Sequence, residues 1–166
     1  PAEAVEIRTQ FQALMAHLQA LPRDRDSYGL VHQDAHLENF FVDEAGNITL
    51  FDFDDCVYGH FIYDIAMVIF YAVMGDFERR TPEFCLPFLR GYRSENQLDP
   101  AWLSEIPHFL KLREIDMIAL IHRSFDVHNL TDPWVAWFMD GRMERMARGE
   151  PYNPVDFREF AEELGG

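Results

Sequence analysis

Two short apolar runs around a turn-forming stretch constrain the fold more than any other part of the chain. The runs read Phe-Phe-Val and Ile-Thr-Leu-Phe, and Asp-Glu-Ala-Gly-Asn separates them. This pattern predicts a β-hairpin. With Val42 paired to Thr49, we expect Asn39 to lie opposite Asp52 at the open end of the hairpin. In chain order, the first strand, the turn and the second strand are predicted at residues 40–42, 43–47 and 48–51.

The polar side chains at the open end of this hairpin are of the kind that binds hard metal ions. Asn39 and Asp52 would lie side by side, and Asp34 stands one short loop before the first strand. One amide oxygen with one or two carboxylates suits Mg²⁺, whose remaining positions are filled by water and phosphate oxygens. In kinases, a loop Asp takes the proton of the attacking hydroxyl, and a later Asn and Asp hold the metal. Asp34, Asn39 and Asp52 have that spacing.

Residues 27–66 resemble the catalytic segment of the aminoglycoside phosphotransferase and choline kinase superfamily, which shares the protein-kinase-like fold. The loop beginning at His32 reads His-Gln-Asp-Ala-His-Leu-Glu-Asn, with Gln33 where the family has Gly. The Asp-Ile-Ala tripeptide that begins at Asp64 also matches the family. The resemblance implies ATP as phosphoryl donor, Mg²⁺ as cofactor and a small-molecule hydroxyl as acceptor. The site residues are then catalytic Asp34, the metal ligands Asn39 and Asp52, and the supporting residues His32, Asp54 and Asp64.

Three positions keep an alternative interpretation. For Asp54, binding of a second metal ion and a role as a structural or solvated carboxylate are equally compatible with the sequence. His36 suits either a contact with the substrate or packing within the loop. Asn39 is a residue that turns favour for its backbone behaviour alone, although its spacing from Asp34 and Asp52 favours the metal.

The chain lacks the sequence signals of a nucleotide-binding half. It contains neither G-x-G-x-x-G nor G-x-x-x-x-G-K-[ST], the glycine-rich loops that cover nucleotide phosphates. Its one lysine, Lys111, falls in a predicted C-terminal helix rather than upstream of the loop. The residues before the loop, from Ala2 to Leu21, read as one amphipathic helix. We therefore expect a C-terminal lobe whose N-terminal nucleotide-binding lobe belongs to the same polypeptide, and little activity from this segment alone.

Composition and charge narrow the environment and the partners. A chain of 166 residues that is 48% hydrophobic can build one domain over residues 1–166, with a catalytic segment at 27–66 and a helical acceptor-binding region at 76–166. The net charge of −15 argues against nucleic acid and permits a cationic acceptor. The longest apolar run, Ile65–Met74, is too short to span a membrane. Two cysteines without C-x-x-C spacing indicate a cytoplasmic protein.

The predicted fold class is α+β and predominantly α-helical: the C-terminal lobe of the protein-kinase-like fold, with one or two small β-hairpins at the catalytic site. Thr81-Pro82 and Asp132-Pro133 resemble an N-cap followed by a first-turn proline. Gly75 should close the helix that precedes them. The helices are predicted over residues 2–21 and 62–74, from near Pro82, from Pro107 through Phe125, from near Pro133 and over 154–164.

The preferred function is ATP-dependent phosphotransfer to a hydroxyl group of a small molecule such as an aminoglycoside, choline or homoserine. One alternative is a kinase-like binding module without catalytic activity. Another is a metal-dependent phosphatase, because Asp52 and Asp54 resemble a D-x-D-x-T nucleophile motif in which Cys56 replaces Thr. A third takes His32, Asp34 and His36 as a transition-metal cluster of a hydrolase.

Overall fold

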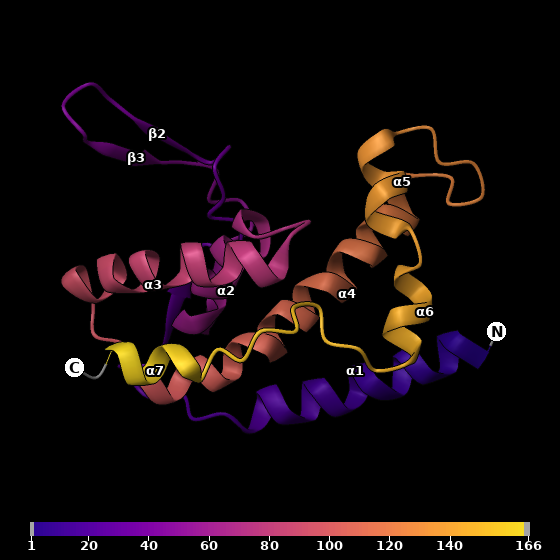
Figure 1. The fold of residues 1–166 in the computed structure, drawn as a ribbon, viewed down its shortest axis with the longest axis horizontal. Helices are drawn as coiled ribbons and strands as arrows, with labels where there is room; N and C mark the ends of the chain where they lie inside the picture. Colours follow the sequence, from indigo (N-terminus) through magenta and orange to yellow (C-terminus); the bar gives the residue numbers. More distant parts are fainter. Residues whose placement is uncertain (1, 165–166) are drawn as a thin grey trace. The chain divides into compact units, whose positions relative to one another are not determined.

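The computed structural model describes residues 2–164, which fall into two compact units (Figure 1). One unit comprises Pro1–Leu21 and Lys111–Tyr152, and the other comprises Pro22–Leu110 and Asn153–Gly166. Among the described residues, no helix combines the length and apolar character needed to cross a membrane. The helices are α1 (Ala2–Ala20), α2 (Phe61–Ala72), α3 (Phe77–Glu95), the 3₁₀ helix η1 (Pro100–Glu105), α4 (Ile106–Ser124), α5 (Pro133–Met139), α6 (Arg142–Ala147) and α7 (Glu159–Leu164). The strands are β1 (Tyr28–Val31), β2 (Phe40–Val42), β3 (Ile48–Leu50) and β4 (Val57–His60).

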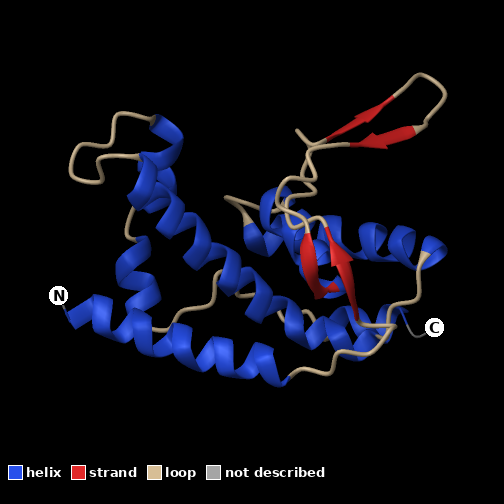
Figure 2. Ribbon diagram, turned by 180° about the vertical axis from the view of Figure 1, so that it is seen from behind, coloured by secondary structure: helices blue, strands red, loops and turns tan. Residues whose placement is uncertain are grey.

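The four strands form two antiparallel ribbons, β1 with β4 and β2 with β3 (Figure 2). The chain leaves β1, enters β2 through residues 32–39, and returns from β3 to β4 through residues 51–56. Both connections therefore run between the same two ribbons. Every site residue predicted from the sequence except Asp64 lies in one of these two connections.

The β2–β3 hairpin forms as predicted, but the predicted register was wrong by one residue. Val42 pairs with Ile48 rather than with Thr49. The cause is the turn, in which Asp43 N donates to Asn47 O at 3.0 Å and Asp43 Oδ1 accepts from Asn47 N at 2.8 Å. These bonds pair Asp43 with Asn47 and leave a shorter loop, which the positive φ of its glycine, 85°, allows to close.

The α2 helix is the core of the unit that contains the ribbons. Its sequence, Phe-Ile-Tyr-Asp-Ile-Ala-Met-Val-Ile-Phe-Tyr-Ala, is apolar on nearly every side, and most of its side chains are buried. A helix of this kind is stable only when neighbours surround it, and α2 contacts β1, β4, α3 and η1. It begins and ends within two residues of the predicted 62–74, and Gly75 follows it at φ 92°. Asp64 lies in its first turn.

The α3 helix starts earlier than predicted, and Pro82 lies inside it. Its first turn forms upstream of the proline, where Arg80 N donates to Asp76 O at 2.9 Å. Beyond the proline the helix buries an apolar face that includes the fully buried Cys85. Burial of that face stabilises the helix across a residue that lacks the N–H for one helical bond. The prediction that the helix begins near Pro82 was therefore wrong.

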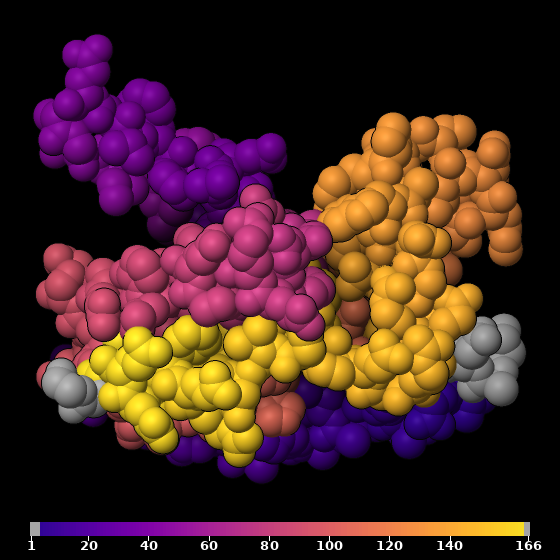
Figure 3. Space-filling model, viewed as in Figure 1, coloured from indigo at the N-terminus to yellow at the C-terminus, as the bar shows by residue number. Residues whose placement is uncertain are grey.

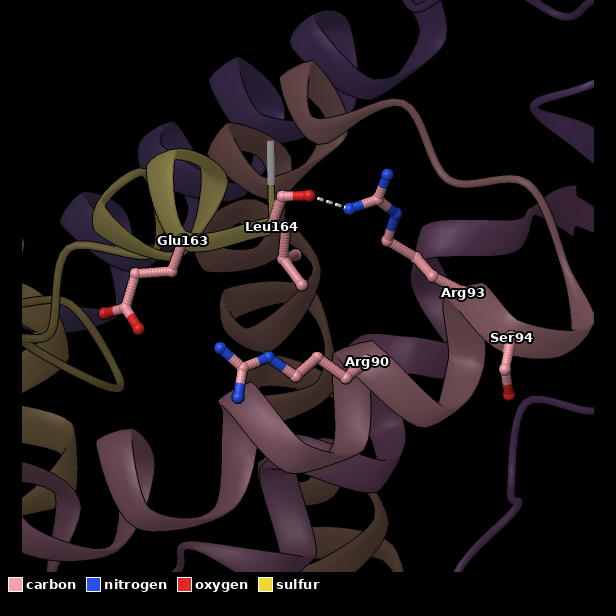
Figure 4. A pocket seen from close by; sticks show the side chains of 5 residues that line it. All are labelled: Arg90, Arg93, Ser94, Glu163 and Leu164. Carbon is pink, nitrogen blue, oxygen red and sulfur yellow. Dashed lines mark hydrogen bonds between the residues drawn. The ribbon is translucent and has the colours of Figure 1, made fainter. Parts of the chain in front are cut away.

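The C-terminal helix α7 is shorter than the predicted range of 154–164. The chain first makes a turn in which Asn153 Oδ1 accepts from Val155 N at 3.0 Å, and Asn153 Nδ2 donates to the buried Thr81 hydroxyl at 2.9 Å. Local bonds of this kind compete with helix formation. Figure 4 shows where α7 meets α3, with Arg93 donating to the carbonyl of Leu164 beside a pocket of about 320 Å³.

The other unit is helical. As predicted, a helix begins at Pro133, and the Asp132 carboxylate caps it by accepting from the backbone N–H groups of the next residues. The predicted long helix from Pro107 is α4, although it ends at Ser124 and leaves Phe125 outside. The buried Glu114 of α4 pairs with Arg142 of α6 at 2.8 Å. Helix α1 contacts α6 and buries Leu14 and Leu18, but it leaves Phe11 36% exposed.

Candidate active site

Asp34 and Asn39 are in direct contact in the connection between β1 and β2. Asn39 Nδ2 donates to the Asp34 backbone carbonyl at 2.8 Å and to Asp34 Oδ2 at 3.0 Å. Asn39 is only 7% exposed, so its amide is held in one orientation. The Nδ2 group faces Asp34, and the Oδ1 atom takes no part in these two bonds. Asn39 thus positions the Asp34 carboxylate and keeps an oxygen of the type that binds hard cations.

His36 also contacts the Asp34 carboxylate. Its Nε2 lies 3.2 Å from Asp34 Oδ2, while its Nδ1 accepts from Glu38 N at 3.2 Å. The imidazole ring packs against Tyr71 of α2, with 4.8 Å between ring centroids. Because Nδ1 is an acceptor, Nε2 carries the hydrogen and donates to Asp34. Asp34 Oδ2 therefore has two donors, Asn39 Nδ2 and His36 Nε2.

The Asp64 carboxylate binds the backbone at the beginning of this loop. Its two carboxylate oxygens accept from the backbone N–H groups of His32 and Gln33, each at 2.8 Å. Bonds from backbone N–H groups to a carboxylate are charge-assisted and stronger than neutral ones. The same carboxylate acts on Tyr92 of α3, whose pKa is raised by burial and by the negative charge of Asp64. The first turn of α2 thus anchors the backbone immediately before Asp34.

His32 connects the two loops of the site. It is 5% exposed, and its Nε2 donates to Phe51 O at 2.9 Å. Its Nδ1 accepts from Asp34 N at 3.3 Å, and its ring packs on Phe53 at 4.7 Å between centroids. With both ring nitrogens occupied in this way, His32 positions the backbone on either side of the site.

Gln33 has a backbone conformation that explains why the family has glycine at this position. Its φ is 67°, in the left-handed region that costs a non-glycine residue about 1–2 kcal/mol. Its side chain Nε2 donates to Asp55 O at 3.1 Å in the second loop. The loop therefore retains the glycine-type turn although glycine is absent.

Asp52 lies next to the predicted position rather than at it. Phe51 N donates to Asn39 O at 3.1 Å, so Phe51 is the residue opposite Asn39, and the expectation that Asp52 occupies that place was wrong by one residue. Asp52 follows with φ 63°, where the chain leaves the hairpin, and both it and Asp54 are exposed. Asp34, Asn39 and Asp52 offer only oxygen atoms for binding a cation. Oxygen donors of this kind suit a hard ion such as Mg²⁺.

Two aromatic contacts of the site were not predicted from the sequence: Phe53 packs against His32, and Tyr71 packs against His36. A signal for Tyr71 was present, because it follows Asp64 by two helical turns and so lies on the same face of α2. No local signal distinguishes Phe53 from the aromatic residues of the neighbouring hairpin.

A family model described as the phosphotransferase enzyme family matches residues 2–106. The chain belongs to this family. It is 39% identical over 163 residues to amicoumacin kinase of Bacillus subtilis (strain 168), a match that covers 95% of this chain and 48% of that protein. Thus the chain spans about half the length of the curated relative.

Solved structures agree with this assignment. The amicoumacin kinase hAmiN in complex with AMP-PNP, Ca²⁺ and Ami has a TM-score of 0.85 and 36% identity, covering 96% of this chain and 49% of that one. A microcompartment-associated aminopropanol kinase has a TM-score of 0.65 and 26% identity, covering 90% and 46%. The predicted fold class is confirmed: this family member has the C-terminal lobe of the amicoumacin kinase fold.

Proposed function

We propose that this segment is the catalytic lobe of an ATP-dependent kinase that phosphorylates a hydroxyl group of a small molecule. The observation that carries the proposal is the Asp34 carboxylate, which two side chains orient on a loop anchored by Asp64. A solvent-facing structural acid would not need this arrangement. Membership of the phosphotransferase family and two small-molecule kinases among the relatives support the same reaction.

In the proposed reaction, Asp34 accepts the proton of the acceptor hydroxyl as the hydroxyl oxygen bonds to the γ-phosphorus of ATP. The bond between that phosphorus and the β,γ-bridging oxygen breaks, and ADP leaves. His36 and Asn39 hold Asp34 Oδ2 and so orient the carboxylate for the proton transfer. Asn39 and Asp52 would hold the divalent cation, which supplies neutralisation of the phosphate charge. Asp54 remains a candidate for a second cation.

The relatives and the charge together suggest the acceptor class. One relative is an amicoumacin kinase and another an aminopropanol kinase. The net charge of −15 would favour an acceptor that carries an amine as well as the reacting hydroxyl. We propose that the nucleotide-binding half lies N-terminal to this segment in the same polypeptide, and that the segment alone has little activity. The two free cysteines support a cytoplasmic location.

Steady-state kinetics of the full-length polypeptide test the catalytic assignment. Asp34→Ala should lower kcat by about 10²–10⁴, the range for loss of a general base, and leave Mg-ATP affinity nearly unchanged. Asp52→Ala should instead weaken binding of the metal-nucleotide complex. Asp26→Ala, at an exposed position before β1, is the matched control. An Asp34→Ala enzyme with the parent kcat would contradict the proposal.

A metal-dependent phosphatase and a binding module without catalytic activity are the alternatives, and each predicts a different result in these assays. A phosphatase would release phosphate from a phosphomonoester without nucleotide. A binding module would leave ATP unconsumed with any hydroxyl acceptor. The same kinetic assays therefore separate all three functions.

A further inference from the structure

An apolar groove of about 610 Å³ lies beneath the β2–β3 hairpin, on the side that faces α2 and α3. Its walls come from all three elements, and no side chain with a formal charge lines it. The hairpin projects away from α3, which is visible in the space-filling view of Figure 3 and in the ribbons of Figures 1 and 2. The lining residues that matter most are Phe40, Ile48 and Leu50 of the hairpin, Tyr71 of α2, and Phe84 and Phe88 of α3.

The hairpin turns an apolar face toward this groove. Its register pairs Phe40 with Leu50 and Val42 with Ile48, so these four side chains share one face. Ile48 is 71% exposed, Val42 47% and Leu50 38%. A two-stranded hairpin is at best marginally stable alone in water. The open end of this hairpin carries Asn39 before β2 and leads into the second loop of the site after β3, so the hairpin must be well ordered for the site to form.

The opposite wall is equally apolar and is formed by aromatic rings. Phe84 and Phe88, one turn apart on α3, stack with 5.3 Å between centroids and an interplanar angle of 17°. The titratable groups that line the groove are Tyr71 and His36, and His36 Nε2 is engaged by Asp34. The groove therefore has no carboxylate to hold the amine of an acceptor and no arginine or lysine to hold a phosphate. Its chemistry matches uncharged side chains.

We propose that the groove is closed by polypeptide: an apolar stretch of the N-terminal half of the same protein packs between the hairpin and α3. The chain has the fold of the C-terminal lobe and covers 48% and 49% of two amicoumacin kinases, so a protein of their length would have a comparable length of chain to supply the occupant. The apolar face also continues past the groove to Val42, which suits an extended protein contact better than a small ligand. The inference rests on the proposed N-terminal half of the same polypeptide, but it does not depend on kinase activity.

Cysteine labelling in the full-length polypeptide tests this proposal. Ile48→Cys places a thiol on the apolar face, and Glu44→Cys places one on the exposed turn of the same hairpin as the matched control. With iodoacetamide and peptide mass spectrometry, which separates the natural Cys56 and Cys85, we expect Ile48→Cys to react at least about tenfold more slowly than Glu44→Cys, because a packed site reacts only through local opening. Equal rates would overturn the proposal.

Ligand-dependent protection and thermal stability distinguish a polypeptide in the groove from a small ligand and from an exposed face. Protection of Ile48→Cys that appears only after Mg-ATP or an acceptor is added would assign the groove to a ligand and refute the polypeptide occupant. Ile48→Lys in the full-length protein should lower Tm by several degrees, whereas Glu44→Lys should melt together with the parent, as surface substitutions do. A parental Tm for Ile48→Lys would show that the face is exposed in the whole protein.

Discussion

Replacing Asp64 by Asn should loosen the loop that carries Asp34. The carboxylate accepts two backbone N–H bonds at 2.8 Å, from His32 and Gln33. A hydrogen bond to a charged group contributes about 1.5–3 kcal/mol. Asn keeps one acceptor oxygen, but its amide NH₂ then faces the other backbone N–H. We therefore expect a loss of about 2–3 kcal/mol in the free energy of unfolding. Because 1 kcal/mol shifts Tm by about 2–4 °C at 150–250 residues and by less in a longer polypeptide, we expect Tm of the full-length protein to fall by about 3–6 °C.

Thermal unfolding of the full-length protein, followed by near-UV circular dichroism, measures this loss. Asp26→Asn makes the same chemical change at an exposed position and should stay within about 0.5 kcal/mol of the parent. In kinetic assays at temperatures where the variant is still folded, Asp64→Asn should also lower kcat, because Asp34 is then less well oriented. If Asp64→Asn melted together with Asp26→Asn, the two backbone bonds would contribute nothing measurable, and the anchoring role of Asp64 would be refuted.

Three other predictions concern a backbone conformation, a buried thiol and a buried ion pair. Gln33→Gly should raise the free energy of unfolding in urea by about 0.5 kcal/mol, because relief of the left-handed strain exceeds the entropy gained by the unfolded chain. Gln33→Val should lower the same free energy by about 1 kcal/mol. The reverse order would contradict the φ of 67° at Gln33. Burial raises the pKa of Cys85 to about 12 from an ordinary 9.0, so at pH 8 iodoacetamide should label Cys56 and spare Cys85. The thiol of the unfolded chain ionises at a lower pH than the buried thiol, so the free energy of unfolding should fall as the pH rises from 9.0 toward about 12. Equal labelling of Cys56 and Cys85 would refute the burial of Cys85. Glu114→Gln leaves Arg142 without its charged partner and should cost about 3 kcal/mol in a thermal melt, and an unchanged melt would show that the pair is not needed.

Local signals predicted the features whose causes are local. The hairpin followed from two apolar runs around Asp43–Asn47, and the α5 start from Asp132 before Pro133, because turn and capping bonds join residues close in sequence. The spacing from Asp34 to Asn39 was equally informative, since one short loop brings the two side chains into contact. The family and fold class could be predicted from this segment for the same reason.

Features that depend on distant contacts were missed or misplaced. Burial of the α3 face extends a helix across Pro82, which a local rule places at a helix start. The register error had a different origin: loops of more than one length are compatible with the turn sequence, and the bonds between Asp43 and Asn47 select the shorter loop, residues 44–46. The groove beneath the hairpin has no sequence signature, because its walls come from segments separated along the chain.

The sequence by itself determined the chemistry of this site: which oxygen atoms are offered, in what order and at what spacing along one loop and one hairpin. Only the tertiary structure decided how that loop is held. Asp64 binds backbone groups 31 and 32 residues away, and His32 reaches Phe51 across 19 residues. Contacts of this length form only when α2 packs against β1, since burial of apolar surface brings the segments together and hydrogen bonds then select their orientation.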